Sequence, residues 1–236
     1  MERRLGVRRL LVILALAMVV ASVSMANPVC VPDGTLQSYI NTYTSLATAC
    51  QIGDKLFYGF SFVPGGGTSA TGVQVNAPAG LDGITEVGIS FNTGGWAVVA
   101  GNVIDAFLGY TVTTLSGQPL IEDATLTIVG TLTGSGGSGT VIETLTPAVA
   151  GSPITDSLPV NTSNHIDFST TTVTTLQVMN EIHLVGGAGF AGLSHISVVE
   201  NDFSENVSLP EPLSMVLIGS GLLLFGAARR KQFRRG

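Results

Sequence analysis

The chain contains three histidines and many serines and carboxylates, the residue types on which hydrolysis and metal binding depend. A serine hydrolase needs a serine, a histidine and an acid within reach, and often carries the serine in a G-x-S-x-G turn. The sequence has no such turn, and its nearest match, residues 134–136, lies in a glycine-rich run. Zinc ligands lie close together in sequence with a third ligand nearby. His183 and His195 would meet only across a hairpin, so we expect exposed strand histidines.

Residues 187–192 have the G-x-G-x-x-G spacing of a dinucleotide-binding loop. Such a loop must lead into a helix, whose N-terminus binds the pyrophosphate. The next residues, LSHISVVE from 193 to 200, alternate as a strand does. We therefore predict a hairpin loop here and no cofactor.

Two carboxylates at a suitable distance would permit glycoside cleavage, but their spacing is a property of the fold. Glu122 with Asp123, and Asp202 with Glu205, are candidates by default, and we interpret them as residues of solvated loops. Trp96, the only tryptophan, is expected in the core and not as a platform for a saccharide. The sequence therefore predicts a non-enzymatic protein with no catalytic residue, metal site or cofactor.

Positive charge is confined to the two ends of the chain. Four arginines fall within the first nine residues and five basic residues within the last eight, and Lys55 alone lies between them. Fourteen of the acidic residues lie between Asp33 and Glu205, so residues 27–209 carry a formal net charge of −13. Nucleic-acid binding needs clustered lysines and arginines. This central region is therefore not expected to bind nucleic acid.

The first 26 residues have the order of a secretory signal peptide. A basic stretch precedes an apolar run from Leu10 to Ala21, and Ser24-Met25-Ala26 supplies a small-x-Ala site. The apolar run is too short for an ordinary membrane span. We predict cleavage between Ala26 and Asn27.

The last 27 residues, 210–236, also have three parts. Pro210-Glu211-Pro212 precedes an uncharged apolar stretch, residues 213–228, and the basic cluster that begins with Arg229-Arg230-Lys231 follows. Sixteen helical residues rise about 24 Å, a little less than the hydrocarbon core, and can span it with local thinning. Basic residues that flank a membrane span stay in the cytoplasm. The basic clusters at both ends of the chain therefore predict that residues 27–209, here called the body, lie outside the inner membrane.

This tail resembles a PEP-CTERM sorting signal, which also circulates under the label "ice-binding protein C-terminal domain". The resemblance rests on Pro210-Glu211-Pro212, on glycines within 213–228 and on Arg229-Arg230-Lys231, while Leu209 replaces the more common valine. It implies processing by an exosortase near the tripeptide, after transient membrane anchoring, and release to the cell surface or beyond. Its usual setting is a biofilm-forming bacterium that makes exopolysaccharide. Thr125, Thr127 and the five threonines within residues 170–175 lack the regular repeat of an ice-binding face.

Cys30 and Cys50 are the only cysteines, and in an exported chain they predict one disulfide. Between them, apolar residues recur with helical spacing from Leu36 to Tyr43, behind Asp33 and Thr35 as candidate caps. We predict a short amphipathic helix that the disulfide links to the first strand.

After Cys50 the apolar residues alternate with period two, and glycine-rich turns separate the alternating segments. In LFYGFSF, residues 56–62, we expect Tyr58, Phe60 and Phe62 to share one face. The other expected strands are 87–91, 108–112, 124–128, 140–145, 165–185 as one or two strands, and 195–203. This pattern predicts an all-β fold, an antiparallel β-sandwich over residues 27–209, with a barrel as the alternative.

The region from Cys30 to Phe62 also resembles the N-terminal part of a group of exported PEP-CTERM proteins of unknown function. We expect a structural or adhesive component of the cell surface or extracellular matrix. The alternatives are a module that binds a saccharide such as exopolysaccharide, and a secreted hydrolase of exopolysaccharide. Binding to a glycan array or turnover of the polysaccharide would distinguish them.

Overall fold

The computed structural model describes residues 27–77, 86–158, 163–168, 172–188 and 192–205. The predicted signal peptide with Ala26, and the predicted sorting signal with its Pro-Glu-Pro motif and basic cluster, lie outside these ranges. Within these ranges, no helix has the length and apolar character that a membrane crossing requires.

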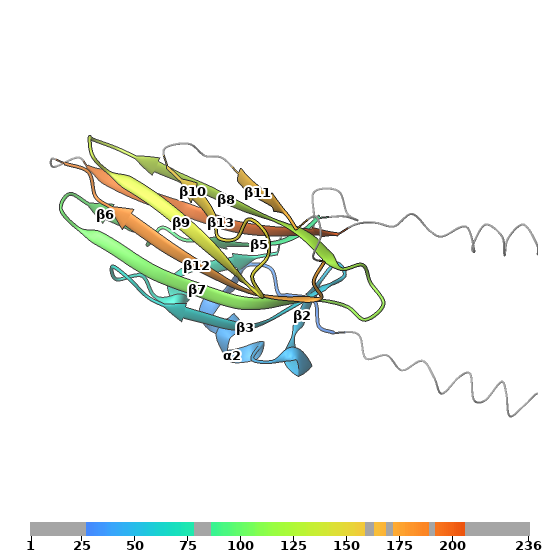
Figure 1. Ribbon diagram of the computed structural model, residues 1–236. Helices are drawn as coiled ribbons and strands as arrows, with labels where there is room; N and C mark the ends of the chain where they lie inside the picture. The colour runs from blue at the N-terminus through green and yellow to red at the C-terminus, as the bar shows by residue number, and fades with distance from the viewer. Residues whose placement is uncertain (1–26, 78–85, 159–162, 169–171, 189–191, 206–236) are drawn as a thin grey trace, which may run out of the picture.

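Two antiparallel sheets make up most of the described chain (Figure 1). Sheet A has the order β10-β9-β12-β7-β3-β2, and sheet B has the order β1-β4-β5-β13-β8-β11 with β6 also paired to β13. The strands of sheet A are β2 (Cys50–Ile52), β3 (Lys55–Val63), β7 (Val103–Thr114), β9 (Ser138–Thr146), β10 (Ile154–Ser157) and β12 (Thr175–Val185). The strands of sheet B are β1 (Gly34–Thr35), β4 (Gln74–Asn76), β5 (Glu86–Asn92), β6 (Ala97–Val99), β8 (Ile121–Leu132), β11 (Ser163–Asp167) and β13 (Leu193–Glu205).

The core lies between the two sheets. Successive side chains of a strand point to opposite faces, so every second residue is buried along β12 and from Ala124 to Gly130 of β8, as their alternating apolar residues predict. The rings of Phe91 in sheet B and Tyr110 in sheet A lie 5.8 Å apart between centroids. Trp96 is fully buried, as expected from the sequence. The prediction of antiparallel sheets with alternating strands is confirmed.

The central strands alternate between the sheets along the chain. β7 belongs to sheet A, β8 to sheet B, and β9 and β10 to sheet A again. The chain then crosses to sheet B at β11, back to sheet A at β12 and to sheet B at β13. The segment 187–192 is therefore not the loop of a hairpin, as the sequence suggested, but a connection between sheets. A strand does follow it, as predicted.

A short helix lies at one side of the two sheets (Figure 1), and a disulfide lies next to it in the sequence. Helix α2 (Leu36–Thr42) begins after Thr35, whose side chain accepts a hydrogen bond from the Ser38 amide. The Tyr39 ring packs edge-on against Phe60 of β3, with centroids 5.1 Å apart. Cys30 and Cys50 form the predicted disulfide, which links the segment before the helix to β2. Two 3-10 turns, η1 (Leu46–Thr48) and η2 (Ala70–Gly72), complete the described helices.

Strand β3 contains an irregularity that the sequence pattern missed. The pairing of β3 with β7 shifts between Tyr58 and Ser61, and Gly59 has a left-handed φ of 67°. A bulge turns the side chains by one position. As a result Phe57 and Phe60 are both buried, whereas Tyr58 is half-buried, and the prediction that Tyr58 shares a face with Phe60 is wrong.

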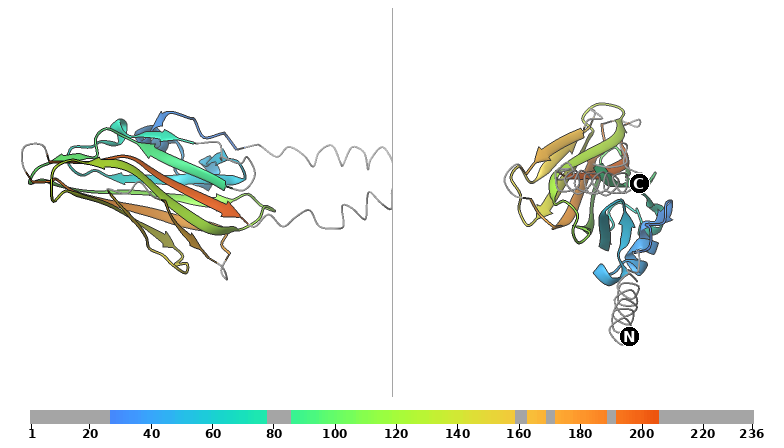
Figure 2. Two further views of the ribbon diagram at one scale, coloured as in Figure 1. Left: turned by 90° about the horizontal axis from the view of Figure 1, so that it is seen from above. Right: turned by 90° about the vertical axis from the view of Figure 1, so that its right-hand side faces the viewer.

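Both ends of the described chain lie at the same end of the two sheets (Figures 1 and 2). At the start, Val29 forms a bridge with Gln51 of β2, and the Gln51 amide donates to the Pro28 carbonyl at 2.8 Å. At the C-terminal end of the described chain, Glu205 of β13 contacts Lys55, the first residue of β3, which pairs with β2.

Candidate functional site

A group of three ionisable side chains, here called the end cluster, lies where the two chain ends meet. It consists of Asp54 in the turn between β2 and β3, Lys55 at the first position of β3, and Glu205 at the last position of β13. The Lys55 Nζ lies 3.0 Å from Asp54 Oδ1 and 3.3 Å from Glu205 Oε2. The cluster therefore connects sheet A to sheet B.

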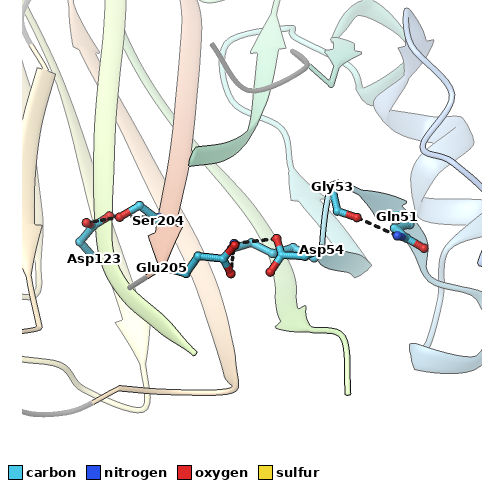
Figure 3. Close-up of polar contacts among 7 residues, drawn as sticks. Gln51, Gly53, Asp54, Asp123, Ser204 and Glu205 are labelled. Atoms are coloured by element: carbon cyan, nitrogen blue, oxygen red, sulfur yellow. Dashed lines mark hydrogen bonds and ion pairs between the residues drawn. The ribbon is translucent and has the colours of Figure 1, made fainter. Parts of the chain in front are cut away.

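Burial of the end cluster is nearly complete. The side chain of Lys55 is 0% exposed, that of Glu205 6% and that of Asp54 16%. Two hydrogen bonds hold the turn in place. The Asp54 carbonyl accepts from the Leu115 backbone amide at 2.8 Å, and the Gln51 side-chain amide donates to the Gly53 carbonyl at 2.7 Å. Figure 3 shows the Glu205 carboxyl facing Asp54, with Gln51 and Gly53 beyond it.

The environment of Glu205 favours its protonated form. Burial and a hydrogen bond with the neighbouring Asp54 carboxyl raise the pKa of Glu205 to about 7, while the charge of Lys55 lowers it. Near neutral pH a large fraction of this carboxyl is therefore uncharged. The end cluster then contains an amine, a carboxylic acid and a carboxylate in mutual contact.

A second contact lies on the other side of Glu205. Asp123 of β8 accepts a hydrogen bond from the Ser204 amide at 3.0 Å and another from the Ser204 hydroxyl. In Figure 3 this pair lies apart from Asp54. Because Ser204 and Asp123 are register partners on adjacent strands, the contact fixes the end of β13 against β8.

A second group, here called the core polar cluster, lies between the sheets and consists of Tyr110, Glu143, Asn180 and Asn201. Each of them is at most 3% exposed. Asn201 of sheet B accepts from the Tyr110 hydroxyl at 3.1 Å and from the Asn180 amide at 2.8 Å. It donates to Glu143 and, at 3.3 Å, to Asn180. Asn201 is thus the link between sheet B and three strands of sheet A.

Glu143 is held in its neutral form. Burial, and then the nearby charge of Asp202, raise the pKa of Glu143 to about 8, although the hydrogen bond from Asn201 opposes the shift. Burial also raises the pKa of Tyr110 well above its ordinary value. At neutral pH the core polar cluster is therefore a network of uncharged groups, which suits a structural role.

The histidines lie on strands, as predicted, and do not come together. His183 is on β12 in sheet A and His195 on β13 in sheet B. His183 Nδ1 lies 2.5 Å from Asp105 Oδ1, and both side chains are about half exposed on the outer face of sheet A. Among the residues whose positions are described, no three His, Cys, Asp or Glu side chains are arranged to hold a metal ion.

The carboxylates named from the sequence are not loop residues. Glu122 and Asp123 lie in β8, and Asp202 and Glu205 lie in β13, so the loop interpretation is wrong. The pattern missed Lys55 and Glu143 because lysine and glutamate side chains are almost never fully buried unless they are paired. The one available signal was compositional, since Lys55 is the single lysine or arginine between residues 27 and 209.

Comparison with known proteins does not assign the chain to a family. No protein-family model matches the chain, and no curated protein matches it.

Proposed function

We propose that the chain is an exported, non-enzymatic component of the cell surface or extracellular matrix, delivered through a PEP-CTERM signal in an exopolysaccharide or biofilm setting. In this proposal residues 1–26 are a signal peptide, residues 27–209 form a β-sandwich, and residues 213–228 anchor the precursor in the inner membrane. An exosortase then cuts near Pro210-Glu211-Pro212 and releases the body.

One observation supports this proposal most strongly: the described chain begins and ends at the same end of the two sheets. Seven residues, 206–212, separate Glu205 from the expected anchor. Seven residues reach at most about 25 Å. The precursor would therefore keep that end of the body close to the membrane and direct the other end away from it.

The two polar clusters support a non-enzymatic role. The side chains of the core polar cluster and of Lys55 and Glu205 are buried, so a dissolved substrate would not reach them. The β-sandwich is supported by two antiparallel sheets that face each other across an apolar core. The net charge of −13 favours a soluble body after release.

The test is the C-terminus of the protein in a host that contains an exosortase. Extracellular material should yield a body that ends near residues 210–212, without Leu213 and the residues after it. Replacement of Pro210, Glu211 and Pro212 by alanine should leave the full-length chain in the inner membrane. Leu209→Val, which restores the common residue, should be processed as the wild type is. Full-length protein as the only wild-type product would refute the proposal.

A further inference from the structure

Lys55 is an unusual lysine for a secreted body. It is the only lysine or arginine among residues 27–209, yet none of its side chain is exposed. Lysines are almost never fully buried unless they are paired, and they normally improve solubility at the surface. This one contributes nothing to the surface. Its amine instead lies between two carboxyl groups, one of which belongs to the last residue of β13.

The buried ion group is costly as long as it stays ionic. Removing a charge from water costs several kcal/mol per ion even after relaxation. Two carboxyls and one amine also leave one negative charge unbalanced when all three are ionised. The raised pKa of Glu205 relieves this by protonation. A covalent amide between Lys55 and Glu205 would remove two of the charges permanently.

We propose that Lys55 and Glu205 condense to an intramolecular amide bond, with Asp54 as the group that transfers the protons. The contacts supply each participant. The amine nitrogen lies 3.3 Å from a carboxyl oxygen of Glu205, and Asp54 lies 3.0 Å from the same nitrogen. The Glu205 carboxyl also faces Asp54 (Figure 3). Asp54 is therefore placed to exchange protons with both reacting groups.

The reaction balances without a further reagent. Asp54 first takes a proton from the Lys55 ammonium group, and the neutral amine attacks the Cδ carbon of protonated Glu205. As the carbon–nitrogen bond forms, the carbon–hydroxyl bond breaks, and the hydroxyl leaves as water with the proton that Asp54 returns. The nitrogen loses its second proton to Asp54, which passes it to solvent. One amide, one water molecule and one proton are the products.

The fold supplies the proximity that two separate molecules lack. Holding two groups in contact corresponds to an effective concentration of about 10⁵–10⁸ M in favourable cases. Burial of the site also restricts the return of water to the amide. The product would join β3 of sheet A to the last residue of β13 in sheet B. The amide would connect the two sheets covalently at Glu205, the residue that precedes residues 206–236.

The test is peptide mapping of the full-length chain, produced with export in bacteria, extracted in detergent and then denatured. After removal of the signal peptide, we expect a mass below that of residues 27–236 by one water molecule and the two hydrogens of the disulfide. Chymotryptic digestion should give one joined peptide pair that contains Lys55 and Glu205. Recovery of the two peptides separately, with a free Lys55 amine, would overturn the proposal.

Amine labelling of the denatured chain gives an independent readout. Lys55 should stay unlabelled, while Lys231, the only other lysine, should react and serves as an internal control. Loss of water elsewhere, such as succinimide formation at Asp82-Gly83, would leave Lys55 reactive and would count against the proposal.

Three variants probe the roles within the cluster. Lys55→Met and Glu205→Ala should abolish the joined peptide. Asp54→Asn should greatly reduce it in a chain that still forms the Cys30–Cys50 disulfide, because an amide cannot carry the proton. Asp123→Asn is the matched control, since this carboxyl bonds Ser204 and should leave the join intact. If the folded Asp54→Asn variant forms as much joined peptide as the wild type, Asp54 does not take part in the reaction.

Discussion

Asn180 and Asn201 hydrogen-bond to each other through both of their amide groups, across the interface between the two sheets. The Asn180 Nδ2 donates to the Asn201 Oδ1 at 2.8 Å, and the Asn201 Nδ2 donates back at 3.3 Å. Such a pair forms only when the sheets meet in one alignment, because both side chains are fully buried. The core polar cluster therefore specifies how sheet B sits on sheet A.

Replacement of Asn201 by leucine should destabilise the body strongly. The change would remove the hydrogen-bond partner of Tyr110, Glu143 and Asn180 together. A buried polar group that loses its partner costs about 1–3 kcal/mol. We expect the free energy of unfolding in urea to fall by about 3–5 kcal/mol. Thr144→Ala, an exposed change on β9, should stay within about 0.5 kcal/mol. Equal losses in the two variants would contradict a specific role for Asn201.

Glu143 should make the body less stable as the pH rises. An unfolded chain releases this proton near 4.5, whereas the folded chain keeps it up to about 8. The folded state thus binds the extra proton in this range, so the free energy of unfolding falls as the pH rises from 4.5 to 8. A shift of this size corresponds to on the order of 5 kcal/mol.

Glu143→Gln provides the measurement for this dependence. Glutamine keeps an oxygen that can accept from Asn201 but cannot ionise, so its unfolding free energy should vary less between pH 5 and pH 8. The variant should therefore be more stable than the wild type at pH 8. An unchanged slope in urea titrations across this range would show that Glu143 does not cause it.

Removal of the disulfide should weaken the N-terminal part of the body. Cys30 and Cys50 are 20 residues apart, and a closed loop of this length stabilises by roughly 3 kcal/mol on the chain-entropy model. The Cys30→Ala, Cys50→Ala double variant should unfold at a lower urea concentration. Reduced wild-type protein should match it. A double variant that unfolds together with the oxidised wild type would contradict this expectation.

Two glycines form a matched pair for steric change. A Cβ atom on Gly186 would lie 2.0 Å from the Val99 carbonyl oxygen, a backbone atom that cannot swing away. A Cβ atom on Gly94 would meet no atom within 4 Å. We expect Gly186→Ala to lower the free energy of unfolding by about 1–3 kcal/mol and Gly94→Ala to change it little. Similar melting temperatures for the two variants would show that the chain at Gly186 can shift.

Much of the local structure follows from the sequence pattern. The helix after Thr35 and the long strands β7, β8, β9, β12 and β13 match alternating or helical apolar spacing. Segment 165–185 does divide into two strands, β11 and β12. The short strands β1, β4, β6 and β10 were not predicted, because two to four residues carry too little pattern. The bulge at Gly59 was missed since glycine alone does not reveal its φ angle.

The features that the sequence did not predict depend on contacts between residues that are far apart in the chain. The assignment of β12 and β13 to different sheets depends on contacts between distant strands, so the segment between them resembled a hairpin loop. Glu143 occupies an inward-facing position of β9, although the sequence alone would place a glutamate at the surface. Its burial depends on the hydrogen bond from Asn201, which lies in the other sheet. In the same way, Lys55 and Glu205 are 150 residues apart, and only the fold brings them together.

Burial of Lys55 also affects the susceptibility of the body to proteases. Trypsin-like enzymes cut after lysine or arginine, and between residues 27 and 209 the chain offers them one such bond, after Lys55. The side chain that would have to enter the protease pocket is enclosed between the sheets and 0% exposed. An intact body thus presents no site to this whole class of enzyme, and it owes that resistance to its composition as much as to its rigidity.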